Sequence, residues 1–303
     1  MKKKLFIFIG IVVFFSFFFL ILSGFEIFNA LKKENNIIPI NTLSLEILEN
    51  MALKQPFNVA ILGDSKKGTK VLERLIKKAK NTGCKVVFHL GDVMPYNNEN
   101  YYRYFYSEFK EMLKEYKIPI FIIPGNHDTR DKSENYNKNL FEKYFGKCNE
   151  IIRINNVEFV LIDDSSGNLN KNNIKNLRKM LDGNNKKLNF LLFHIPTRDP
   201  RPKKNHCLHN TVSKKLLEQF IGNYKFNAVF SAHIHSHGFY KIGNIPVYIT
   251  GEAGASLIVG RDYSFLKLSI ENNEFKVKRI VMPWEIGLHF IDYFETKVIK
   301  FLN

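Results

Sequence analysis

The first half of the chain alternates short apolar runs with longer amphipathic stretches. The runs 57–62, 86–90 and 118–123 are rich in β-branched residues and are bounded by turn residues, which predicts buried strands. Between them, an apolar stripe within 71–79 predicts one helix, and the aromatic, charged stretch 99–116 predicts another. The order strand, helix, strand, helix, strand is typical of parallel strands joined by right-handed crossovers.

The second half of the chain predicts a second sheet. A hairpin at 151–162 turns at Asn155-Asn156, and the segments after residue 238 are hairpin-like as well. The other predicted elements are helices near 173–181 and 212–221 and strands at 188–193, 228–231, 239–242, 246–250, 265–270 and 275–280. Two β-rich sheets with helices outside them predict an α/β fold, a four-layer α/β/β/α sandwich, as one domain over residues 56–282.

The N-terminus predicts a membrane anchor. Residues 5–25 carry no charge and follow three lysines, Lys2 to Lys4. At about 1.5 Å per residue, a helix over this run spans roughly 30 Å, the thickness of the hydrocarbon core. The run is longer than the apolar region of a cleavable signal peptide. We therefore expect residues 1–25 to form an uncleaved, single-pass transmembrane helix with a cytoplasmic N-terminus, which places the domain outside the cytoplasm.

Two further segments flank the predicted domain. Residues 26–55 are polar, with a short helical pattern around 43–53, and are interpreted as a juxtamembrane connector. The tail 283–303 has apolar residues at helical spacing, namely Ile286, Phe290, Phe294, Val298 and Leu302. A terminal helix packed on the domain is the simpler interpretation, since amphipathic helices mostly face a core. The alternative is a helix that lies on the membrane surface beside the anchor.

The net charge is high, but the basic residues are not clustered along the sequence. The chain carries 45 Lys+Arg against 29 Asp+Glu, a net charge of +16. The lysines are scattered, with no arginine-rich stripe and no nucleic-acid motif, so specific nucleic-acid binding is not expected and a nuclease is only a weak alternative. Three cysteines are too few for a disulfide framework and do not decide the compartment.

The predicted strands end in residues that bind metals in other proteins. In chain order these residues are Asp64, Asp92, Asn126, His194, His233 and His235. Each alone has an ordinary explanation, such as a turn or a helix cap. Two aspartates, an asparagine and three histidines at successive strand ends are hard to explain as an accident. The carboxyl ends of strands are where ligands bind in open α/β sheets, so the pattern predicts a metal or catalytic site.

The order of these motifs resembles the calcineurin-like metallophosphoesterase superfamily. The pattern of that family is D-x-H, GD, GNH[DE], an isolated H and GHxH. This chain has, in the same order, Asp64-Ser65-Lys66, Gly91-Asp92, Gly125-Asn126-His127-Asp128, Phe193-His194-Ile195-Pro196 and Ala232-His233-Ile234-His235. The resemblance covers about residues 57–255.

The resemblance implies two metal ions, each of them Mn, Fe, Zn or Co, bridged by Asp92. The other implied ligands are Asn126, His194 and His233 for one ion and Asp64 and His235 for the second. Such a pair activates a water and clamps a phosphoryl group for in-line attack. The implied activity is hydrolysis of a phosphomonoester or phosphodiester by a metal-bound hydroxide. His127 would act near the leaving group, and Asp128 would position its ring.

Two residues depart from the family pattern. Ala232 replaces a glycine, which is a minor change if its φ is negative. Lys66 replaces a histidine ligand, and an ammonium has no lone pair to donate. Lys66 could therefore weaken a first metal site held by Asp64, Asp92 and His235, or bind the substrate phosphate. It could also mark a non-catalytic phosphate-sensing or partner-binding module. We favour an active enzyme, because the other ligand types are retained.

Three further residues are candidates for binding the substrate. Arg201 and His206 lie in a loop rich in Pro and Lys that follows His194. His237 continues the alternation of His233 and His235. Loops at strand ends often carry function, although a solvated loop explains these residues equally well.

Overall fold

Two β-sheets lie face to face in the computed structural model, which describes residues 27, 29–31, 36–66, 69–169, 171–181, 188–255, 262–283, 285, 291 and 297–300. The first sheet has the strand order β11 (Glu274–Met282), β10 (Tyr263–Glu271), β1 (Phe57–Leu62), β2 (Cys84–His89) and β3 (Ile120–Ile122). The second has the order β4 (Glu150–Ile154), β5 (Val157–Leu161), β6 (Leu188–Leu192), β7 (Ala228–Ser231), β9 (Ile245–Ile249) and β8 (Gly238–Ile242).

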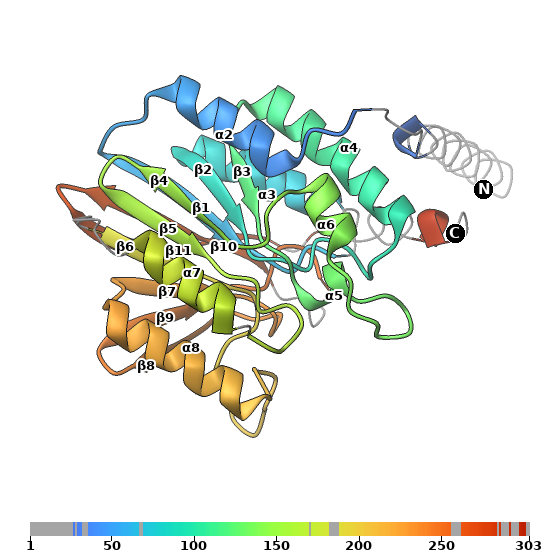
Figure 1. Cartoon of the computed structure of the whole chain (residues 1–303). Helices are drawn as coiled ribbons and strands as arrows, with labels where there is room; N and C mark the ends of the chain where they lie inside the picture. The colour runs from blue at the N-terminus through green and yellow to red at the C-terminus, as the bar shows by residue number, and fades with distance from the viewer. Residues whose placement is uncertain are drawn as a thin grey trace, which may run out of the picture.

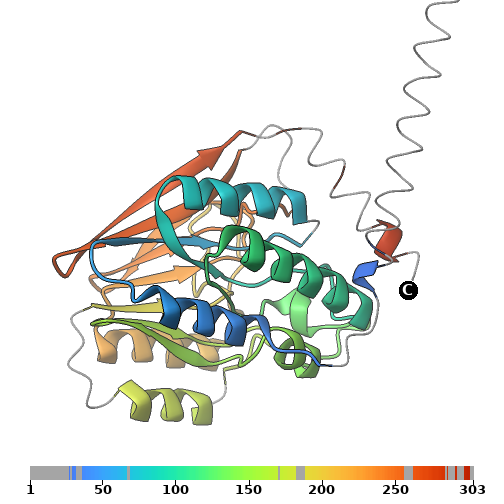
Figure 2. The same ribbon diagram turned by 90° about the horizontal axis from the view of Figure 1, so that it is seen from above.

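Helices cover the outer face of each sheet (Figures 1 and 2). The helices on the first sheet are α2 (Ile40–Met51), α3 (Thr69–Asn81), α4 (Glu99–Tyr116) and α6 (Asn139–Tyr144). Those on the second sheet are α7 (Lys171–Leu181) and α8 (Thr211–Tyr224). A short helix, α5 (Asn126–Thr129), follows β3. The described part of the chain therefore has the four layers that the sequence predicted.

The central strands are apolar throughout because both of their faces are buried. Side chains of a strand point alternately to its two sides. In β1, Val59 and Ile61 face the second sheet, whereas Ala60 and Leu62 face α3 and α4. β1, β2 and β3 pair in parallel, as predicted from the order of strands and helices. Parallel strands covered on both faces read as continuous apolar runs, which is why these strands were predictable.

Helix α2 closes the edge of the first sheet at β3. The side-chain amide of Asn41 donates to the carbonyl of Ile122 at 2.9 Å and accepts from its N–H at 2.8 Å. The hydroxyl of Ser44 makes the same pair of hydrogen bonds with Ile120, at 2.6 and 3.0 Å. We predicted a connector over residues 26–55, but the structure packs α2 onto the domain. The fold therefore begins before residue 56.

The two terminal predictions fall mostly outside the described residues. The predicted transmembrane helix at 5–25 lies entirely outside them. Within the described ranges, no helix is long and apolar enough to cross a bilayer. Of the tail 283–303, residues 297–300 are helical, and Ile299 is buried in the same apolar cluster as Ile27. This part of the tail packs on the domain, whereas contact of the tail with a membrane stays a prediction.

Replacing Asn41 by alanine should destabilise the fold strongly. The change leaves both backbone groups of Ile122 buried without a partner, and each such group costs about 1–3 kcal/mol. We expect the free energy of unfolding to fall by about 3 kcal/mol, measured by urea unfolding of the full chain in detergent. Asn50→Ala, at an exposed position of the same helix, should change it by less than about 0.5 kcal/mol. Equal effects of the two substitutions would contradict the role of Asn41.

Candidate metal centre

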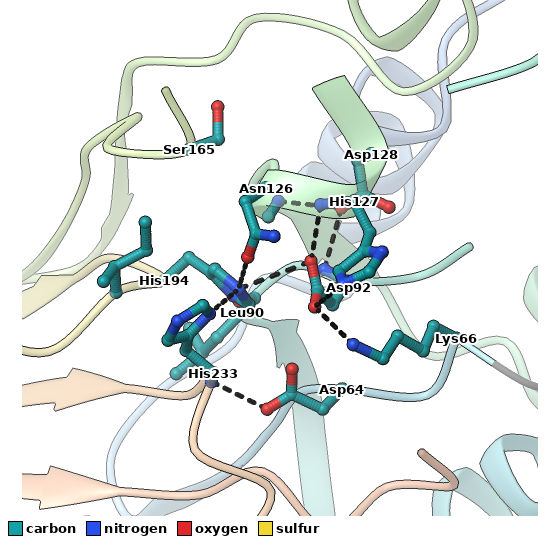
Figure 3. A network of polar contacts seen from close by, with 12 residues as sticks. Asp64, Lys66, Leu90, Asp92, Asn126, His127, Asp128, Ser165, His194 and His233 are labelled. Carbon is teal, nitrogen blue, oxygen red and sulfur yellow. Dashed lines mark hydrogen bonds and ion pairs between the residues drawn. The ribbon is translucent and has the colours of Figure 1, made fainter. Parts of the chain in front are cut away.

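Loops from both sheets carry polar side chains to one edge of the molecule. In chain order these are Asp64 after β1, Asp92 after β2, Asn126 after β3, His194 after β6, and His233 and His235 after β7. The strands before them are parallel within each sheet, so their carboxyl ends point to the same edge. Figure 3 shows the labelled side chains of this set pointing toward one another. The structure thus brings together all six residues that were predicted as ligands.

Four of these residues form a group that we call the histidine cluster: Asp92, Asn126, His194 and His233. The Nδ1 atom of His194 donates to the carbonyl of Leu90 at 2.6 Å, which fixes the tautomer of the ring. Its Nε2 atom then faces Asn126 Oδ1 at 3.2 Å and His233 Nδ1 at 3.2 Å. Asp92 Oδ1 lies 3.4 Å from the same Nε2 atom.

The imidazoles of the histidine cluster are held neutral by their burial. Burial lowers the pKa of His194, and burial together with His194 lowers the pKa of His233 to about 2. A neutral His194 ring that donates through Nδ1 has a lone pair on Nε2. That lone pair faces the oxygens of Asn126 and Asp92, which are also acceptors. Lone pairs that converge on one point repel one another unless a cation lies between them. These side chains therefore fit a bound metal ion.

A second group, the carboxylate cluster, consists of Asp64, Asp92 and His235, whose ligand atoms all lie within 4.8 Å of one another. One oxygen of Asp64, Oδ2, accepts the backbone N–H of His233 at 2.7 Å. The other, Oδ1, is buried without a hydrogen-bond partner among the described residues, and His235 Nε2 lies 3.8 Å from it. Burial and the carboxylate of Asp92 raise the pKa of Asp64. An unpaired buried carboxylate oxygen is costly, so this cluster also fits a cation.

The backbone is strained where it presents these side chains. Asp64, Asp92, His233 and His235 have φ angles of 60°, 56°, 71° and 47°. A residue with a Cβ atom adopts this left-handed region at a cost of about 1–2 kcal/mol. Ala232, which stands where the family pattern has glycine, is not among the residues with positive φ. Its replacement of glycine is therefore accommodated without strain, whereas four of the six candidate ligands are strained.

The carboxylate of Asp128 holds backbone groups and does not contact the His127 ring. Its oxygens accept the N–H groups of Gly125, Asp92, Val93 and Met94 at 2.7, 2.8, 2.9 and 3.1 Å. The His127 ring is oriented instead by the Pro95 carbonyl, which lies 2.6 Å from Nδ1. The prediction that Asp128 positions this ring is wrong. Asp128 ties the loop after β2 to the loop after β3.

Asp164 has the equivalent role in the second sheet, and the sequence analysis missed it. Its two oxygens accept the N–H groups of His194 and Ile195 at 3.0 and 2.9 Å. The carboxyl group is fully buried, and burial raises its pKa. Asp164 comes shortly after the end of β5, so the signal that singled out Asp64 and Asp92, an aspartate at a strand end, was present here too.

Lys66 points into the centre. Its backbone N–H donates to the Asp92 carbonyl at 3.0 Å, and its Nζ atom lies 3.2 Å from Asp92 Oδ2. The Nε2 atom of His127 lies 3.9 Å from the same oxygen. Figure 3 shows Lys66 entering beside Asp64 and Asp92. The Lys66 ammonium is therefore part of the centre and not of the solvent-exposed surface.

Arg201, predicted to bind the substrate, is occupied by other groups. Its Nε and one terminal nitrogen bind both oxygens of Asp199, at 2.9 and 2.8 Å. The remaining terminal nitrogen donates to the Ile234 carbonyl at 2.8 Å. Since Ile234 stands between His233 and His235, Arg201 holds the loop that carries both histidines. The structure gives it a positioning role, and its contact with the substrate stays a prediction.

The other two substrate candidates differ in their placement. The His206 ring packs against the His233 ring, with centroids 4.1 Å apart, so it borders the histidine cluster. The backbone N–H of His237 donates to Glu252 at 3.2 Å, and its side chain belongs to neither cluster. His206 therefore remains a substrate candidate, whereas nothing places His237 at the centre.

A cavity of about 390 Å³ opens beside the histidine cluster. Asn126 and His233 form part of its wall. The other lining residues are Arg130, Ser166, Gly167, Asn168, Ile195, His206, Cys207, Leu208, His209 and Asn210. Pockets for small ligands measure roughly 300–1,000 Å³. The cavity is therefore large enough for a small organic substrate whose reacting group lies against the cluster.

Solved structures share the fold at low sequence identity. A dimetal phosphatase from Danio rerio aligns with a TM-score of 0.58 at 10% identity, covering 76% of this chain and 100% of that one. An anchor in the inner membrane complex of Plasmodium, named GAP50, aligns with a TM-score of 0.52 at 12% identity, covering 81% and 95%. At these identities, the likeness concerns the fold alone.

Sequence comparison identifies the family. A protein of Vesicomyosocius okutanii subsp. Calyptogena okutanii (strain HA), described as "Probable cyclic nucleotide phosphodiesterase", is 26% identical over 172 residues, 56% of this chain and 70% of that protein. The sequence pattern of the family described as Calcineurin-like phosphoesterase matches residues 57–237, more than half of the chain. This range holds both clusters, and it confirms the resemblance that the motifs indicated. The chain belongs to the calcineurin-like phosphoesterase family and is a hydrolase of phosphoric esters.

Proposed function

We propose that the chain is a metal-dependent phosphodiesterase whose substrate is about the size of a nucleotide. The observation that carries this proposal is the cavity of about 390 Å³ with Asn126 and His233 in its wall. A diester bound there would lie against the histidine cluster. The relative described as a probable cyclic nucleotide phosphodiesterase supports a diester over a monoester.

The donor set of the histidine cluster favours a first-row metal ion. Carboxylate and amide oxygens together with imidazoles suit Mn, Fe, Co or Zn. Such an ion, when bound, supplies Lewis acidity toward a phosphoryl oxygen and lowers the pKa of a bound water. The chain contributes rigid positioning of these donors through Leu90, Asp128 and Asp164.

His127 is placed to handle the proton of the leaving group. The Pro95 carbonyl holds its Nδ1 atom, so Nε2 is the nitrogen that is open to a substrate. The side chain is 39% exposed, and its Nε2 atom lies 3.9 Å from Asp92 Oδ2 at the edge of the cluster. When the ring carries a proton on both nitrogens, it can donate the proton on Nε2 to an alkoxide as it leaves phosphorus, and the ring is then neutral.

The rim of the cavity is suited to a polar organic group. The Arg130 guanidinium is fixed by the Ser166 carbonyl at 2.9 Å. The side chains of Asn168 and Asn210 are hydrogen-bonded to each other at 2.6 Å across the rim. Together with His206, these residues offer donors, acceptors and a ring face in the wall of the same cavity as Asn126 and His233.

Addition of Mn²⁺ should stabilise the protein through His194. At about 100 times the dissociation constant, binding adds about 2.7 kcal/mol, which raises the Tm of a domain of this size by about 5 °C. In His194→Ala this metal-dependent rise should vanish, while the matched variant His209→Ala on the cavity rim should keep it. Differential scanning fluorimetry of the metal-free full chain in detergent measures both. A full rise in His194→Ala would exclude the histidine cluster as the metal site.

Hydrolysis should show a dependence on the leaving group that identifies His127. In the metal-loaded full chain, we expect turnover of 3′,5′-cyclic AMP and of bis-para-nitrophenyl phosphate, with less turnover of para-nitrophenyl phosphate. His127→Ala should lower kcat for the cyclic nucleotide by about 10²–10⁴-fold, the usual contribution of a general acid. The loss for bis-para-nitrophenyl phosphate should be much smaller, because nitrophenolate leaves without a proton.

The control for this experiment is the same pair of substrates with Asn50→Ala, an exposed position on α2 outside the cavity, which should retain both activities. Equal losses for the two diesters in His127→Ala would contradict proton transfer by this residue. Preferential turnover of the monoester would contradict the assignment as a diesterase. No turnover in a chain that binds Mn²⁺ would favour a binding module over an enzyme.

We also propose that residues 5–25 anchor the enzyme in a membrane, with the domain outside the cytoplasm. The uncharged run after three lysines supports this proposal. The chain just after the run is docked on the domain, because Ile27 is buried and the Leu31 carbonyl accepts from Arg103 at 3.3 Å. An anchor that ends so near the domain would hold the phosphoesterase close to the bilayer surface.

Two lysines in the apolar run should release the protein from membranes. Lysine at the centre of a membrane helix costs about 3 kcal/mol on the insertion scale. The double variant Phe14→Lys/Phe18→Lys should therefore appear in the supernatant after carbonate extraction, whereas the wild type and Phe14→Leu/Phe18→Leu stay in the pellet. Protease added to intact cells should cleave the domain of the wild type. Release of the wild type by carbonate would contradict the anchor.

A further inference from the structure

The Lys66 side chain lies within the carboxylate cluster. Its Nζ atom is 3.2 Å from Asp92 Oδ2, and the side chain is only 13% exposed. The backbone N–H of Lys66 is bound to the Asp92 carbonyl, so both ends of this residue are tied to one partner. The ammonium is thus held beside Asp92 and is not a mobile, solvent-exposed group.

This cluster needs positive charge. Asp64 and Asp92 are both fully buried, and Asp64 Oδ1 has no hydrogen-bond partner among the described residues. Two neighbouring buried carboxylates repel each other unless a cation lies close to them. A metal ion could supply that charge, but a fixed ammonium 3.2 Å from the shared ligand Asp92 supplies it already.

The same ammonium opposes a metal ion at this position. A divalent ion bound by Asp64, Asp92 and His235 would share Asp92 with Lys66, and like charges this close in a dry site repel strongly. Lysine also removes a ligand, because the ammonium donates hydrogen bonds and has no lone pair. The cluster is left with three candidate ligands and a competing charge.

We propose that the Lys66 ammonium takes the place of one of the two metal ions, so that the chain binds a single ion, at the histidine cluster. That cluster keeps four convergent donors from Asp92, Asn126, His194 and His233. Because it assigns a metal to this cluster, the inference rests on the proposed function.

The consequence for the reaction concerns charge on the phosphoryl group. An ammonium is a hydrogen-bond donor as well as a cation, so Lys66 can contact a phosphoryl oxygen that lies between the two clusters. Unlike a metal ion, it cannot dissociate. Activation of the enzyme should therefore saturate with the first ion bound, with no second, weaker phase.

The test counts metal ions and does not depend on turnover. The full chain is purified in detergent, freed of metal by a chelator and titrated with Mn²⁺. Calorimetry and elemental analysis measure the number of ions bound, and electron paramagnetic resonance shows whether they are coupled. We expect about one Mn²⁺ per chain, with the six-line spectrum of an isolated ion. In Lys66→His, which restores a ligand and removes the charge, we expect about two per chain and an exchange-coupled spectrum.

Two more variants separate the charge from the ligand. Lys66→Met removes the charge without adding a ligand and should admit a second ion more weakly than Lys66→His does. Asp64→Asn should leave the count for the wild type unchanged but abolish the second ion of Lys66→His. About two coupled ions in the wild type, or no second ion in Lys66→His, would overturn the inference. Hydrolysis is measured separately, so an inactive chain that binds one ion would refute the proposed function and leave this inference standing.

Discussion

The centre depends on two buried carboxylates that capture the backbone of the loops around it. Asp128 accepts four N–H groups and ties the loops after β2 and β3 together. Asp164 accepts two and fixes the loop that carries His194 in the second sheet. Such loops have no strand partner of their own, so these buried carboxyl oxygens supply the acceptors that their N–H groups need. Asp92, Asn126 and His194 owe their positions to these bonds, whereas Arg201 holds the loop with His233 and His235.

Much of the fold and the candidate ligands could be predicted from the sequence, because buried strands mark themselves as apolar runs and the ligands lie where these runs end. A strand buried on both faces is a continuous apolar run, so β1, β2 and β6 stand out. Where such a run ends, the chain turns at the edge of the sheet, and a polar residue there faces the crevice. Asp92 and His194 were found for that reason.

The roles of other residues could not be predicted, because they are set by partners in space. The Asp128 side chain follows His127 directly, yet it binds backbone N–H groups of residues 92–94. Every residue type except proline has the same backbone N–H and C=O groups. A side chain that binds a backbone group therefore has no partner residue type that a sequence motif could show. The same holds for Arg201, whose partner is the Ile234 carbonyl. The sequence showed that Lys66 departs from the family motif. That its side chain points toward Asp92 depends on the fold and could not be read from the sequence.

The way α2 seals β3 also bears on how this protein avoids its own aggregation. An open sheet edge offers a row of N–H and C=O groups on which an extended segment of another chain can pair. Here Asn41 and Ser44 occupy the groups of Ile122 and Ile120 with side chains, so no strand can add at β3. A chain clipped between α2 and β1 could release that helix and keep its core. It would then present a bare, apolar strand as a template for polymerisation.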